Sequence, residues 1–481
     1  MSAAVGERVE FEPVIGLEIH VQLATRTKMF CSCPLSFGEE PNTRTCPVCL
    51  GLPGALPVPN SEAVHFALMI ALAFGCEIAP RALFHRKNYF YPDLPKGYQI
   101  SQYDEPLGRH GRLGDVRIHR VHLEEDAAKL VHASSSGRIH GAEASIVDFN
   151  RGGTPLVEIV TEPDLRSPEQ AAEFGRLLQA TLRRLGVSDV NMEEGSLRID
   201  ANVSVRPAGS SELGTKTELK NMNSFRFLER GLAAEIERQR ALLDAGEAVV
   251  QETLHFDPRS GALSPLRSKE EAHDYRYFPE PDLVPLVPTE EMIARARQAL
   301  PELPAERAER FQRELGLAAD AARLLAFRFE LGDFFELALA AGDGVDARAL
   351  ANWTVNELAA RVGDSDPAAS PLTAEAFAQL VSLVQQRRIS AAAGKDVLDR
   401  LVAAGGNPHA IVEELGLEMA ASDELDTIVE EAIRENADAV AKIRAGKVQA
   451  VGAIVGAVMR ATRGRADGAE VQRLVREKLG L

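Results

Sequence analysis

The distribution of residue types divides this chain into two parts that must fold differently. All six tyrosines and all five cysteines of the 481 residues lie before residue 290, in a part that also holds most of the Gly and Pro. From about Glu290 onward the sequence is rich in Ala, Leu, Glu and Arg, most of which favour helices. The pattern predicts a first part that mixes strands and helices and a second part that is all helical.

Local signals place several elements in the first part. Residues 14–23 alternate apolar and polar side chains, which predicts a half-buried strand. Asn60 and Ser61 can cap an apolar helix that Gly75 ends. Residues 167–170 have the form of a capping box, and the apolar residues that follow recur at helical spacing. A third helix is expected from Ser224 to near Gly246.

Charge and hydropathy limit the class of protein. The formal net charge of -17 argues against a surface coated with basic residues but leaves room for a local basic patch. No apolar run reaches the roughly 20 residues of a membrane-spanning helix, and residues 1–13 do not resemble a signal peptide. We therefore expect a cytoplasmic protein, in which five cysteines stay reduced rather than form a disulfide framework.

Four cysteines are spaced like the ligands of a structural metal site. Cys31 and Cys33 form one pair, and Cys46 and Cys49 form a second pair after twelve intervening residues. Two such pairs can surround one zinc ion with four thiolates, which leaves no open position for catalysis. The spacing predicts a structural zinc ribbon over residues 31–49, and four unrelated reduced thiols are the alternative. Cys76 is expected to be a buried core thiol.

Acidic side chains occur where strands are expected. Glu18 and His20 are two residues apart in the alternating run, so on a strand they share one face. Glu158 lies in the apolar run 155–160, and residues 124–126 are all acidic and follow another such run. Several carboxylates with a histidine can bind a Mg²⁺ ion that bridges phosphate oxygens. The alternative is that each carboxylate lies on a solvated strand face.

The tyrosines fall in two segments that also carry basic residues. Four lie in residues 86–103 together with Lys87 and Lys96, and two lie in residues 274–282. Such segments suit stacking on a base and contacts to phosphate, although an aromatic turn packed on a sheet is an equal alternative. Arg151 precedes a Gly-Gly turn of the kind that lets backbone N–H groups approach a phosphate. The sequence has no Gly-x4-Gly-Lys-Ser/Thr loop, so an ATP site in this chain is not a P-loop.

Charge is segregated near the C-terminus. Residues 423–438 hold seven acidic residues and one basic residue, whereas residues 442–481 hold nine basic and three acidic residues. Lys447 and residues 459–465 flank an apolar stretch that we expect to be a helix. A basic end on an acidic chain is typical of a surface that binds an RNA backbone. A charged helical face that only keeps the tail in solution is the alternative.

Long motifs in this sequence closely resemble the GatB/GatE family, the B subunits of tRNA-dependent amidotransferases. Two examples are Cys46-Pro-Val-Cys-Leu-Gly-Leu-Pro-Gly and Arg86-Lys-Asn-Tyr-Phe-Tyr-Pro-Asp. The resemblance covers essentially the whole chain, through residues 14–23, 46–58, 86–103, 123–129, 148–160, 220–225, 351–353, 446–448, 455–459 and 462–465.

The resemblance implies the kinase and transamidase part of a glutamine-hydrolysing ligase, a heterotrimer that also contains A and C subunits. ATP would phosphorylate the side-chain carboxylate of Glu-tRNA(Gln), or of Asp-tRNA(Asn), and ammonia from glutamine hydrolysed in the A subunit would displace the phosphate. The residues that match family positions associated with the catalytic Mg²⁺ are Glu18, His20, Glu125 and Glu158. The choice between Glu124 and Glu125 stays open because adjacent strand residues point in opposite directions. The four cysteines match the zinc-bearing branch of the family.

Together these features predict an α+β fold in three domains. We expect a catalytic domain over residues 1–293 built on an antiparallel sheet with flanking helices, an all-α connector over residues 294–409, and a small all-α tRNA-binding tail over residues 410–481. The residues expected to bind ATP or the aminoacyl substrate are Lys87, Asn88, Tyr89, Lys96, Tyr98 and Arg151. Those expected to contact tRNA are Lys447, Arg460, Arg463 and Arg465. The rival hypotheses are a non-catalytic tRNA-binding scaffold and a stand-alone metal-dependent phosphotransferase that acts on a small acid.

Overall fold

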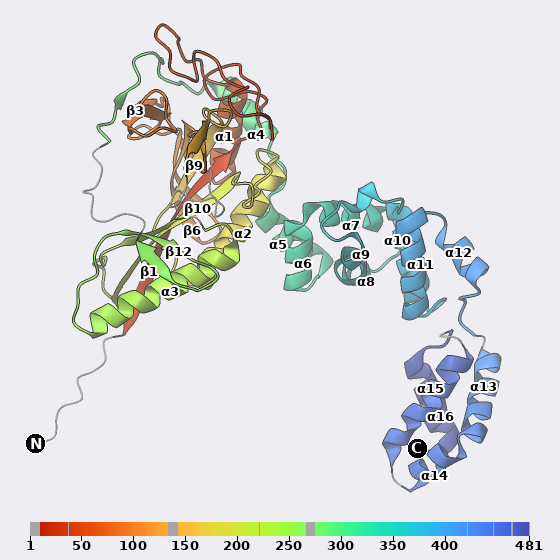
Figure 1. Cartoon of the computed structure of the whole chain (residues 1–481). Helices are drawn as coiled ribbons and strands as arrows, with labels where there is room; N and C mark the ends of the chain where they lie inside the picture. The colour runs from red at the N-terminus through yellow and green to blue at the C-terminus, as the bar shows by residue number, and fades with distance from the viewer. Residues whose placement is uncertain are drawn as a thin grey trace, which may run out of the picture. The chain divides into compact units, whose positions relative to one another are not determined.

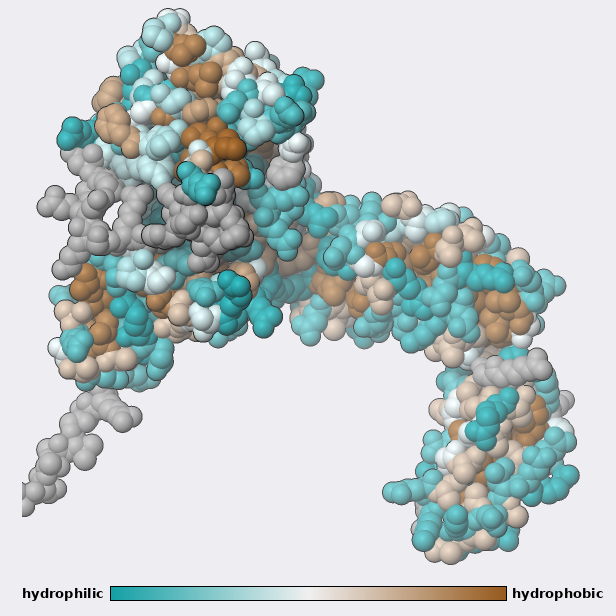
Figure 2. All heavy atoms as spheres, in the orientation of Figure 1, coloured by the Kyte–Doolittle hydropathy of each residue, from teal (hydrophilic) through white to brown (hydrophobic). Residues whose placement is uncertain are grey.

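The computed structural model of the chain describes residues 10–36, 38–132, 143–220, 222–265, 275–420, 422–445, 447–462 and 465–480. The chain divides into two compact units, Met1–Leu303 and Pro304–Leu481 (Figure 1). Hydrophilic residues cover much of the visible face of each unit, with smaller hydrophobic areas between them (Figure 2). Among the described residues, no helix combines the length and the apolar character needed to cross a bilayer.

The first unit is built on a nine-stranded sheet whose described strand pairs are antiparallel except for β11 with β12. From edge to edge its strands are β13 (Leu263–Pro265), β12 (Thr253–Phe256), β11 (Thr217–Lys220), β10 (Leu197–Pro207), β1 (Phe11–Gln22), β9 (Pro155–Thr161), β6 (Val116–Glu125), β5 (Gly108–Leu113) and β2 (Glu77–Ile78). A three-stranded sheet holds β14 (Phe278–Pro279), β3 (His85–Asn88) and β4 (Tyr98–Ser101), and β7 (Lys129–His132) pairs with β8 (Ser145–Asp148). The predicted α+β fold is confirmed.

One face of the large sheet is apolar and packs with three helices. These are α1 (Ser61–Ala73), α2 (Pro168–Leu185) and α3 (Phe225–Asp244). On the central strand β1, Leu17, Ile19 and Val21 alternate into this core, which leaves the residues between them on the opposite face. The sheet therefore has one face committed to the core and one face free for polar side chains.

The ends of these helices agree with the capping signals in the sequence. Asn60 accepts hydrogen bonds from the backbone N–H groups of Glu62 and Ala63, Ser167 accepts one from Gln170, and Ser224 accepts one from Phe227. At the other end of α2, Gly186 adopts the left-handed conformation that stops the helix. The three helices thus begin at the residues that the sequence predicted.

The first compact unit extends beyond the expected boundary at residue 293. That residue lies inside α4 (Glu290–Gln298), whose Ala296 is fully buried in the core of the first unit. A helix whose side chains complete a core folds with that core, so the unit continues to Leu303.

The second unit is helical and holds two hydrophobic clusters. The first cluster is formed by α5 (Pro304–Leu315), α6 (Ala319–Phe327), α7 (Phe329–Ala341), α8 (Ala347–Asn352), a π-helical turn (Trp353–Leu358), α9 (Ala359–Val362), α10 (Ala374–Gln385), α11 (Ala391–Ala404) and α12 (Pro408–Leu415). A 3-10 turn (Pro367–Ala369) lies between α9 and α10. The second is formed by α13 (Ser422–Glu435), α14 (Ala437–Arg444), a 3-10 turn (Val448–Ala450), α15 (Val451–Ala461) and α16 (Gly468–Leu479). Ile411 and Val412 of α12 belong to the first cluster, so a boundary at residue 410 would divide that helix from its own core.

Candidate functional sites: a four-cysteine cluster and an acid–histidine cluster

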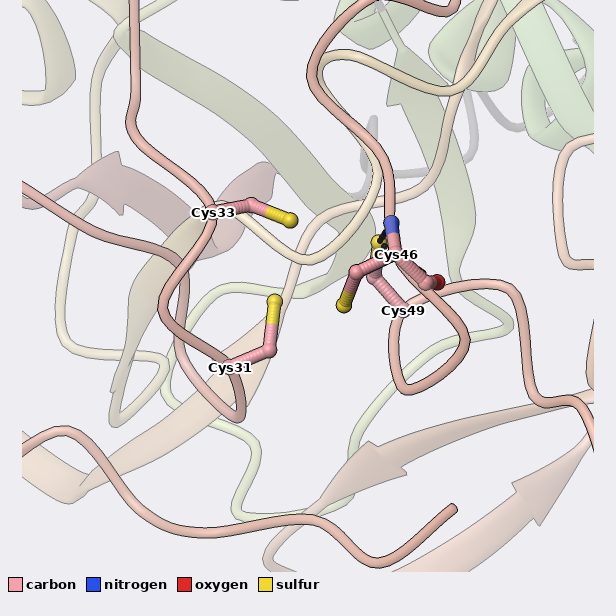
Figure 3. Close-up of side chains that lie close together, drawn as sticks. All are labelled: Cys31, Cys33, Cys46 and Cys49. Atoms are coloured by element: carbon pink, nitrogen blue, oxygen red, sulfur yellow. Dashed lines mark hydrogen bonds between the residues drawn. The ribbon is translucent and has the colours of Figure 1, made fainter. Parts of the chain in front are cut away.

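The four cysteine side chains of residues 31–49 converge on one point (Figure 3). The sulfur atoms of Cys31, Cys33, Cys46 and Cys49 all lie within 4.8 Å of one another. Four thiolates bonded to one tetrahedral zinc at about 2.3 Å lie about 3.8 Å apart. The donor set and the spacing therefore fit one zinc ion, as the sequence spacing predicted. Cys76 is buried in the core of the first unit, also as predicted.

Charged and polar groups around the cluster favour the thiolate form of Cys49, whereas a hydrogen bond with Cys49 raises the pKa of Cys31 and burial raises that of Cys33. Lys28 is fully buried, and its Nζ donates a hydrogen bond to the carbonyl of Phe149 at 2.9 Å and lies 3.7 Å from the sulfur of Cys49. A hydrogen bond from Cys31, with help from the backbone N–H of Cys46 and the charge of Lys28, overcomes burial and lowers the pKa of Cys49 to about 4. A cation at this position offsets part of the negative charge of a four-thiolate metal site.

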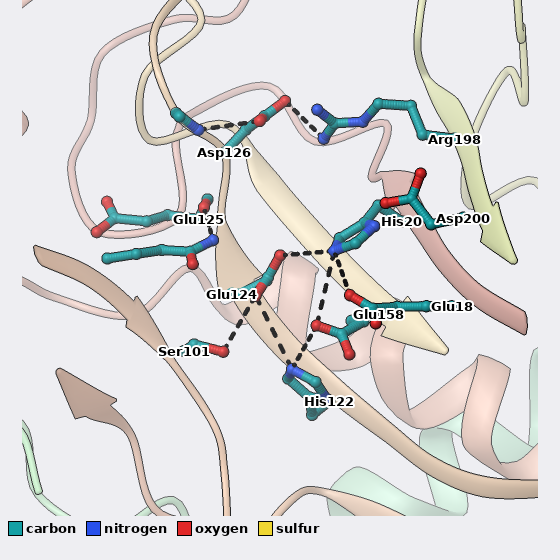
Figure 4. Close-up of polar contacts among 12 residues, drawn as sticks. Glu18, His20, Ser101, His122, Glu124, Glu125, Asp126, Glu158, Arg198 and Asp200 are labelled. Carbon is teal, nitrogen blue, oxygen red and sulfur yellow. Dashed lines mark hydrogen bonds and ion pairs between the residues drawn. The ribbon is translucent and has the colours of Figure 1, made fainter. Parts of the chain in front are cut away.

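Acidic and imidazole side chains gather on the polar face of the large sheet (Figure 4). The Nε2 of His20 lies 3.8 Å from Glu18 Oε1, 3.5 Å from Glu124 Oε1 and 3.6 Å from Glu158 Oε2. The pairing of strands produces this cluster, because β1 lies between β10 and β9 and sets His20 directly opposite Glu158. Glu18, His20 and Glu158 form a group whose ligand atoms could hold one metal ion.

The structure corrects the expected position of Glu125. Glu124, not Glu125, faces His20, while the Glu125 carboxylate pairs with Lys96 and accepts a hydrogen bond from the backbone N–H of Ile100 at 3.0 Å. Both glutamates are buried, so solvent exposure does not separate them. Glu125 therefore lies outside the acid–histidine cluster.

A bulge in β6 decides which glutamate faces the cluster. The register between β6 and β9 shifts between Ile118 and Arg120, where His119 is the additional residue. Before the bulge Ile118 belongs to the apolar core, and after it Val121 and Leu123 do. A shift of one residue exchanges the two faces of a strand, so Glu124 reaches the polar face only because of the bulge.

Neighbouring groups hold the buried carboxylates in place. Ser101 donates a hydrogen bond to Glu124 Oε2 at 3.1 Å, and Arg120 donates one to Glu158 Oε1 at 3.1 Å. His122, which follows Arg120 on the same face of β6, lies with its Nε2 3.3 Å from Glu158 Oε2. These contacts leave the other carboxylate oxygens directed at the imidazole rings.

The carboxylates and imidazoles of the cluster shift one another's pKa values. Burial opposes a charge on His20, but the carboxylates of Glu158, Glu124 and Glu18 raise its pKa to about 9. Burial and the nearby charge of Glu158 raise the pKa of Glu18. Despite its burial, Glu158 has a pKa well below the usual value because His122 and His20 stabilise the carboxylate. A divalent ion would take over the role of these positive charges.

The two tyrosine-containing segments meet beside this cluster. Asn88 donates side-chain hydrogen bonds to the carbonyls of Tyr275 and Arg276, at 3.1 and 2.8 Å, and β14 pairs with β3. Tyr277 stacks on Tyr103 with ring centroids 4.1 Å apart. The Nζ of Lys87 lies 4.8 Å from the centre of the Tyr275 ring. Burial disfavours the Lys87 charge, but Glu124, Tyr277 and Glu158 raise its pKa.

The other residues expected to bind ATP or substrate have different surroundings. Lys96 forms an ion pair with Glu125, and the Arg86 guanidinium lies 4.2 Å from the centre of the Tyr98 ring. The Tyr89 ring lies 5.9 Å from that of Tyr91. Lys87 differs from these three residues, because Glu124 and Glu158 of the acid–histidine cluster stabilise its charge.

The contacts of Arg151 are with the loop that follows β6. Its guanidinium donates hydrogen bonds to the carbonyls of Ala127 and Ala128, at 3.0 and 2.9 Å, and lies 3.7 Å from Asp126. Arg198 of β10 pairs with the same carboxylate at 3.0 Å. These two cations, working against burial, lower the pKa of Asp126. Arg151 therefore helps to fix the loop that follows β6.

Three of the four residues expected to contact tRNA are described. The side chains of Lys447 and Arg460 are exposed. Both residues belong to the part of the helical unit that contains the second hydrophobic cluster. Arg465 pairs with Glu424 at 3.1 Å. Arg463 lies outside the described residues.

The sequence did not single out His122, Lys28 or Ser101. The spacing of His122 and Glu124 at positions i and i+2 is the same signal that drew attention to Glu18 and His20, and it was available in the sequence. No sequence signal marks Lys28, because its role depends on the burial of a single lysine beside the folded cysteine loop.

The fold and the two sites define a sheet-based protein with an acid–histidine centre able to hold a divalent cation, a four-cysteine cluster, and a helical C-terminal unit. The family model described as the GatB/GatE catalytic domain matches residues 13–294, and the GatB domain model matches residues 333–479. The chain belongs to the GatB/GatE family, as its motifs suggested.

Curated relatives match over nearly the whole chain. A protein of Persephonella marina is 46% identical, covering 98% of this chain and 100% of its own length. A protein of Frankia casuarinae is 50% identical over 98% and 96% of the two chains, and one of Geobacter sulfurreducens is 48% identical over 98% and 100%. Each is named as the B subunit of an aspartyl/glutamyl-tRNA(Asn/Gln) amidotransferase.

Proposed function

We propose that this chain is the B subunit of a tRNA-dependent amidotransferase. It acts on Glu-tRNA(Gln), on Asp-tRNA(Asn), or on both, and converts the side-chain carboxylate of the attached amino acid to an amide at the expense of ATP. The ammonia comes from glutamine that the A subunit hydrolyses, and the C subunit is the third member of the heterotrimer. The names of the full-length relatives support this assignment.

The observation that carries the proposal is the convergence of Glu18, His20, Glu124 and Glu158 on one face of the sheet beside Lys87. Glu124 and Glu158 are almost fully buried, whereas the Glu18 and His20 side chains retain 31% and 19% exposure. The cluster is thus open on the side of Glu18 and closed behind it. This is the arrangement of a site that receives a charged substrate from solvent rather than of a buried structural network.

The chemistry requires activation of a poor electrophile. A carboxylate oxygen of the aminoacyl group attacks the γ-phosphorus of ATP, ADP leaves, and an acyl phosphate forms. Ammonia then adds to the acyl carbon, phosphate leaves, and the amide remains. In this proposal Lys87 contacts phosphate oxygens as a point charge, and the hydrogen bonds from Ser101 and Arg120 keep Glu124 and Glu158 oriented toward the reacting groups.

The acid–histidine cluster fits the divalent cation that such a transfer uses. Glu18, His20, Glu124 and Glu158 would hold Mg²⁺, and the carboxylate oxygens are hard ligands of the kind it prefers. When bound, the ion supplies positive charge to the phosphate oxygens. The four cysteines would hold zinc, whose role here is to fix the loop 31–49 to the 148–153 segment through Lys28.

The tail provides the contact with tRNA in this proposal. Lys447 and Arg460 are exposed cations on a helical module, and the basic C-terminal stretch stands out in a chain of net charge -17. An enzyme that acts on aminoacyl-tRNA during protein synthesis is expected in the cytoplasm.

The test is to co-express the chain with candidate A and C subunits and to assay both mischarged tRNAs with ATP, Mg²⁺ and glutamine. We expect an amide product on at least one tRNA that requires both ATP and Mg²⁺. His20→Ala should abolish amidation, while size-exclusion chromatography should show that the heterotrimer still forms.

Two outcomes would favour the rival hypotheses. If the His20→Ala complex amidated tRNA at the wild-type rate, the result would support a non-catalytic scaffold. Full ATP-dependent activity of the isolated chain on free glutamate or aspartate, without tRNA or partners, would support a stand-alone phosphotransferase.

A further inference from the structure

Four arginines of the β5–β6 hairpin lie opposite one another in pairs. Arg109 of β5 is opposite Arg120 of β6 in the antiparallel register. Farther along the hairpin, Arg112 is opposite Arg117. Like charges directly opposite each other destabilise a sheet, so these two pairs are a cost to folding in a chain whose net charge is -17. We call the four residues the hairpin arginines.

The hairpin arginines point away from the hydrophobic core. Each is next in sequence to a residue that faces the core helices, and successive side chains of a strand point to opposite faces. The core-facing neighbours are Gly108 and Leu113 on β5 and Val116, Ile118 and Val121 on β6. The hairpin arginines therefore lie on the polar face of the sheet, the face that also carries the acid–histidine cluster.

The hairpin begins at the edge of that cluster. Arg120 donates a hydrogen bond to Glu158 Oε1 at 3.1 Å. At about 3.3 Å per residue, Glu124 lies about 13 Å from Arg120 along β6, and Arg117 lies about 10 Å from it in the other direction. The hairpin arginines thus extend the polar face beyond the cluster over a length that holds more than one phosphate group of a nucleic acid.

Two of the hairpin arginines keep their charge uncompensated. Arg117 and Arg120 each pair with a carboxylate. Arg109 and Arg112 are exposed, and each donates a hydrogen bond to a backbone carbonyl instead. Neither of these two forms an ion pair within the part of the chain that the structure describes. Both guanidinium groups can therefore bind an anion from solution.

The chemistry of the site favours a phosphate group as that anion. The planar fork of a guanidinium group can bind two phosphate oxygens at once. In the function proposed above, the substrate is an amino acid attached to the 3′ end of an RNA. When its carboxylate reaches the acid–histidine cluster, the phosphates of the adjoining nucleotides must lie on the surface around the cluster.

We propose that the hairpin arginines bind phosphodiester groups at the acceptor end of tRNA, with Arg109 and Arg112 as the main contacts. This inference rests on the proposed function and adds to it a second RNA contact, on the catalytic unit rather than on the tail. The competing explanation is that the same charges bind an acidic surface of a partner subunit.

The experiment measures RNA binding by the heterotrimeric complex. The probe is an uncharged minihelix that contains only the acceptor stem and the 3′ end of the tRNA, and filter binding gives its affinity at several salt concentrations. We expect the double variant Arg109→Gln with Arg112→Gln to bind the minihelix about tenfold more weakly, with a slope of log affinity against log salt reduced by about one for each lost phosphate contact. The tail is intact in both complexes, so the difference belongs to the hairpin.

Conservative and control variants separate an RNA contact from a structural role. Arg109→Lys with Arg112→Lys keeps both charges and should keep most of the salt slope. The double glutamine variant should unfold at the same urea concentration as the wild type or a higher one, because it removes charges that face like charges. Arg176→Gln is the matched control, since Arg176 is an exposed arginine of α2, which packs on the other face of the sheet, and its loss should leave minihelix affinity unchanged.

An unchanged minihelix affinity and salt slope in the double glutamine variant overturns the proposal. Loss of a subunit from that complex in size-exclusion chromatography also overturns it, because the surface would then bind a protein partner. Amidation by the wild-type complex keeps this failure separate from failure of the proposed function. Normal amidation with an unchanged minihelix affinity refutes only the hairpin contact, whereas the absence of amidation on either tRNA refutes the function.

Discussion

Glu124 and Glu125 are neighbours on β6, yet Glu124 Oε1 lies 3.5 Å from His20 Nε2, whereas Glu125 Oε1 accepts a hydrogen bond from the Ile100 N–H at 3.0 Å. The two carboxylates therefore lie on opposite faces of one strand. The difference predicts distinct consequences for the same substitution at adjacent positions.

We expect Glu124→Gln to lower the amidation rate by about 10²–10³-fold with little loss of stability, because it removes a charge that faces the reacting groups. Glu125→Gln should instead lower the free energy of unfolding by about 3–5 kcal/mol, because it leaves the buried ammonium of Lys96 uncompensated. Amidation kinetics and urea denaturation of both variants measure these effects.

The double variant Lys96→Met with Glu125→Gln is the control, and it should recover part of the lost stability because no buried charge remains unpaired. If Glu125→Gln abolished amidation at unchanged stability, Glu125 would be the residue that acts in catalysis, as the family motifs suggested.

The raised pKa of His20 predicts a pH-dependent stability in Mg²⁺-free buffer. The folded-state pKa of about 9 lies above the ordinary value of 6.5, so the protonated form favours the folded state. This contribution should be fully present below pH 6.5 and be lost as the pH rises through 9. Urea denaturation of the wild type and of His20→Gln at several pH values between 6 and 9.5 measures it.

The difference in unfolding free energy between the two proteins should be largest at pH 6 and shrink toward pH 9.5. A difference that stays constant with pH would show that His20 is not charged in the metal-free fold. Saturating Mg²⁺ should reduce the pH dependence, because the ion and the proton compete for the same nitrogen.

The position of Lys28 predicts that the zinc affinity of the four-cysteine cluster depends on this side chain. Its buried Nζ lies 3.7 Å from the Cys49 sulfur and donates a hydrogen bond to the Phe149 carbonyl. Groups that contact metal ligands from outside typically change metal affinity by about 10–100-fold when removed. We expect Lys28→Met to weaken zinc binding within this range, as measured by competition with a chromogenic chelator.

Arg44→Ala is a suitable control for Lys28→Met. Arg44 lies in the same loop and forms an exposed pair with Glu39 at 2.7 Å, so its removal should leave zinc affinity unchanged. Equal zinc affinity of the wild type and Lys28→Met would mean that the lysine only ties the loop to Phe149.

The tail prediction concerns tRNA affinity and its dependence on salt. Replacing Lys447 and Arg460 together by Ala should weaken tRNA binding and lower the slope of log affinity against log salt concentration by about one for each phosphate that is no longer neutralised. Filter binding by the heterotrimer at several salt concentrations measures both quantities.

Arg473→Ala is the matched control, because its guanidinium already pairs with Glu470 and Glu477 at 2.8 Å on its own helix. If the double variant kept the wild-type affinity and salt slope, Lys447 and Arg460 would not be part of the tRNA interface. A deletion that tests the whole tail should start after Glu418, since α12 belongs to the preceding hydrophobic cluster.

The sequence determined the features that depend on neighbours along the chain. Side-chain oxygens of Asn60, Ser167 and Ser224 start α1, α2 and α3 because a capping oxygen needs only the N–H groups two or three residues ahead. The spacing of the four cysteines likewise predicted their convergence, because two short turns are enough to present each pair.

Tertiary structure alone decided the composition of the acid–histidine cluster. A single additional residue in β6, at the bulge next to Arg120, turned Glu124 rather than Glu125 toward His20 and brought His122 to the same face. Such a bulge is fixed by pairing with β9, far away in the sequence, so no local pattern reports it. The meeting of Tyr103 with Tyr277 and the burial of Lys28 beside Cys49 have the same origin, since each depends on segments that become neighbours only when the chain folds.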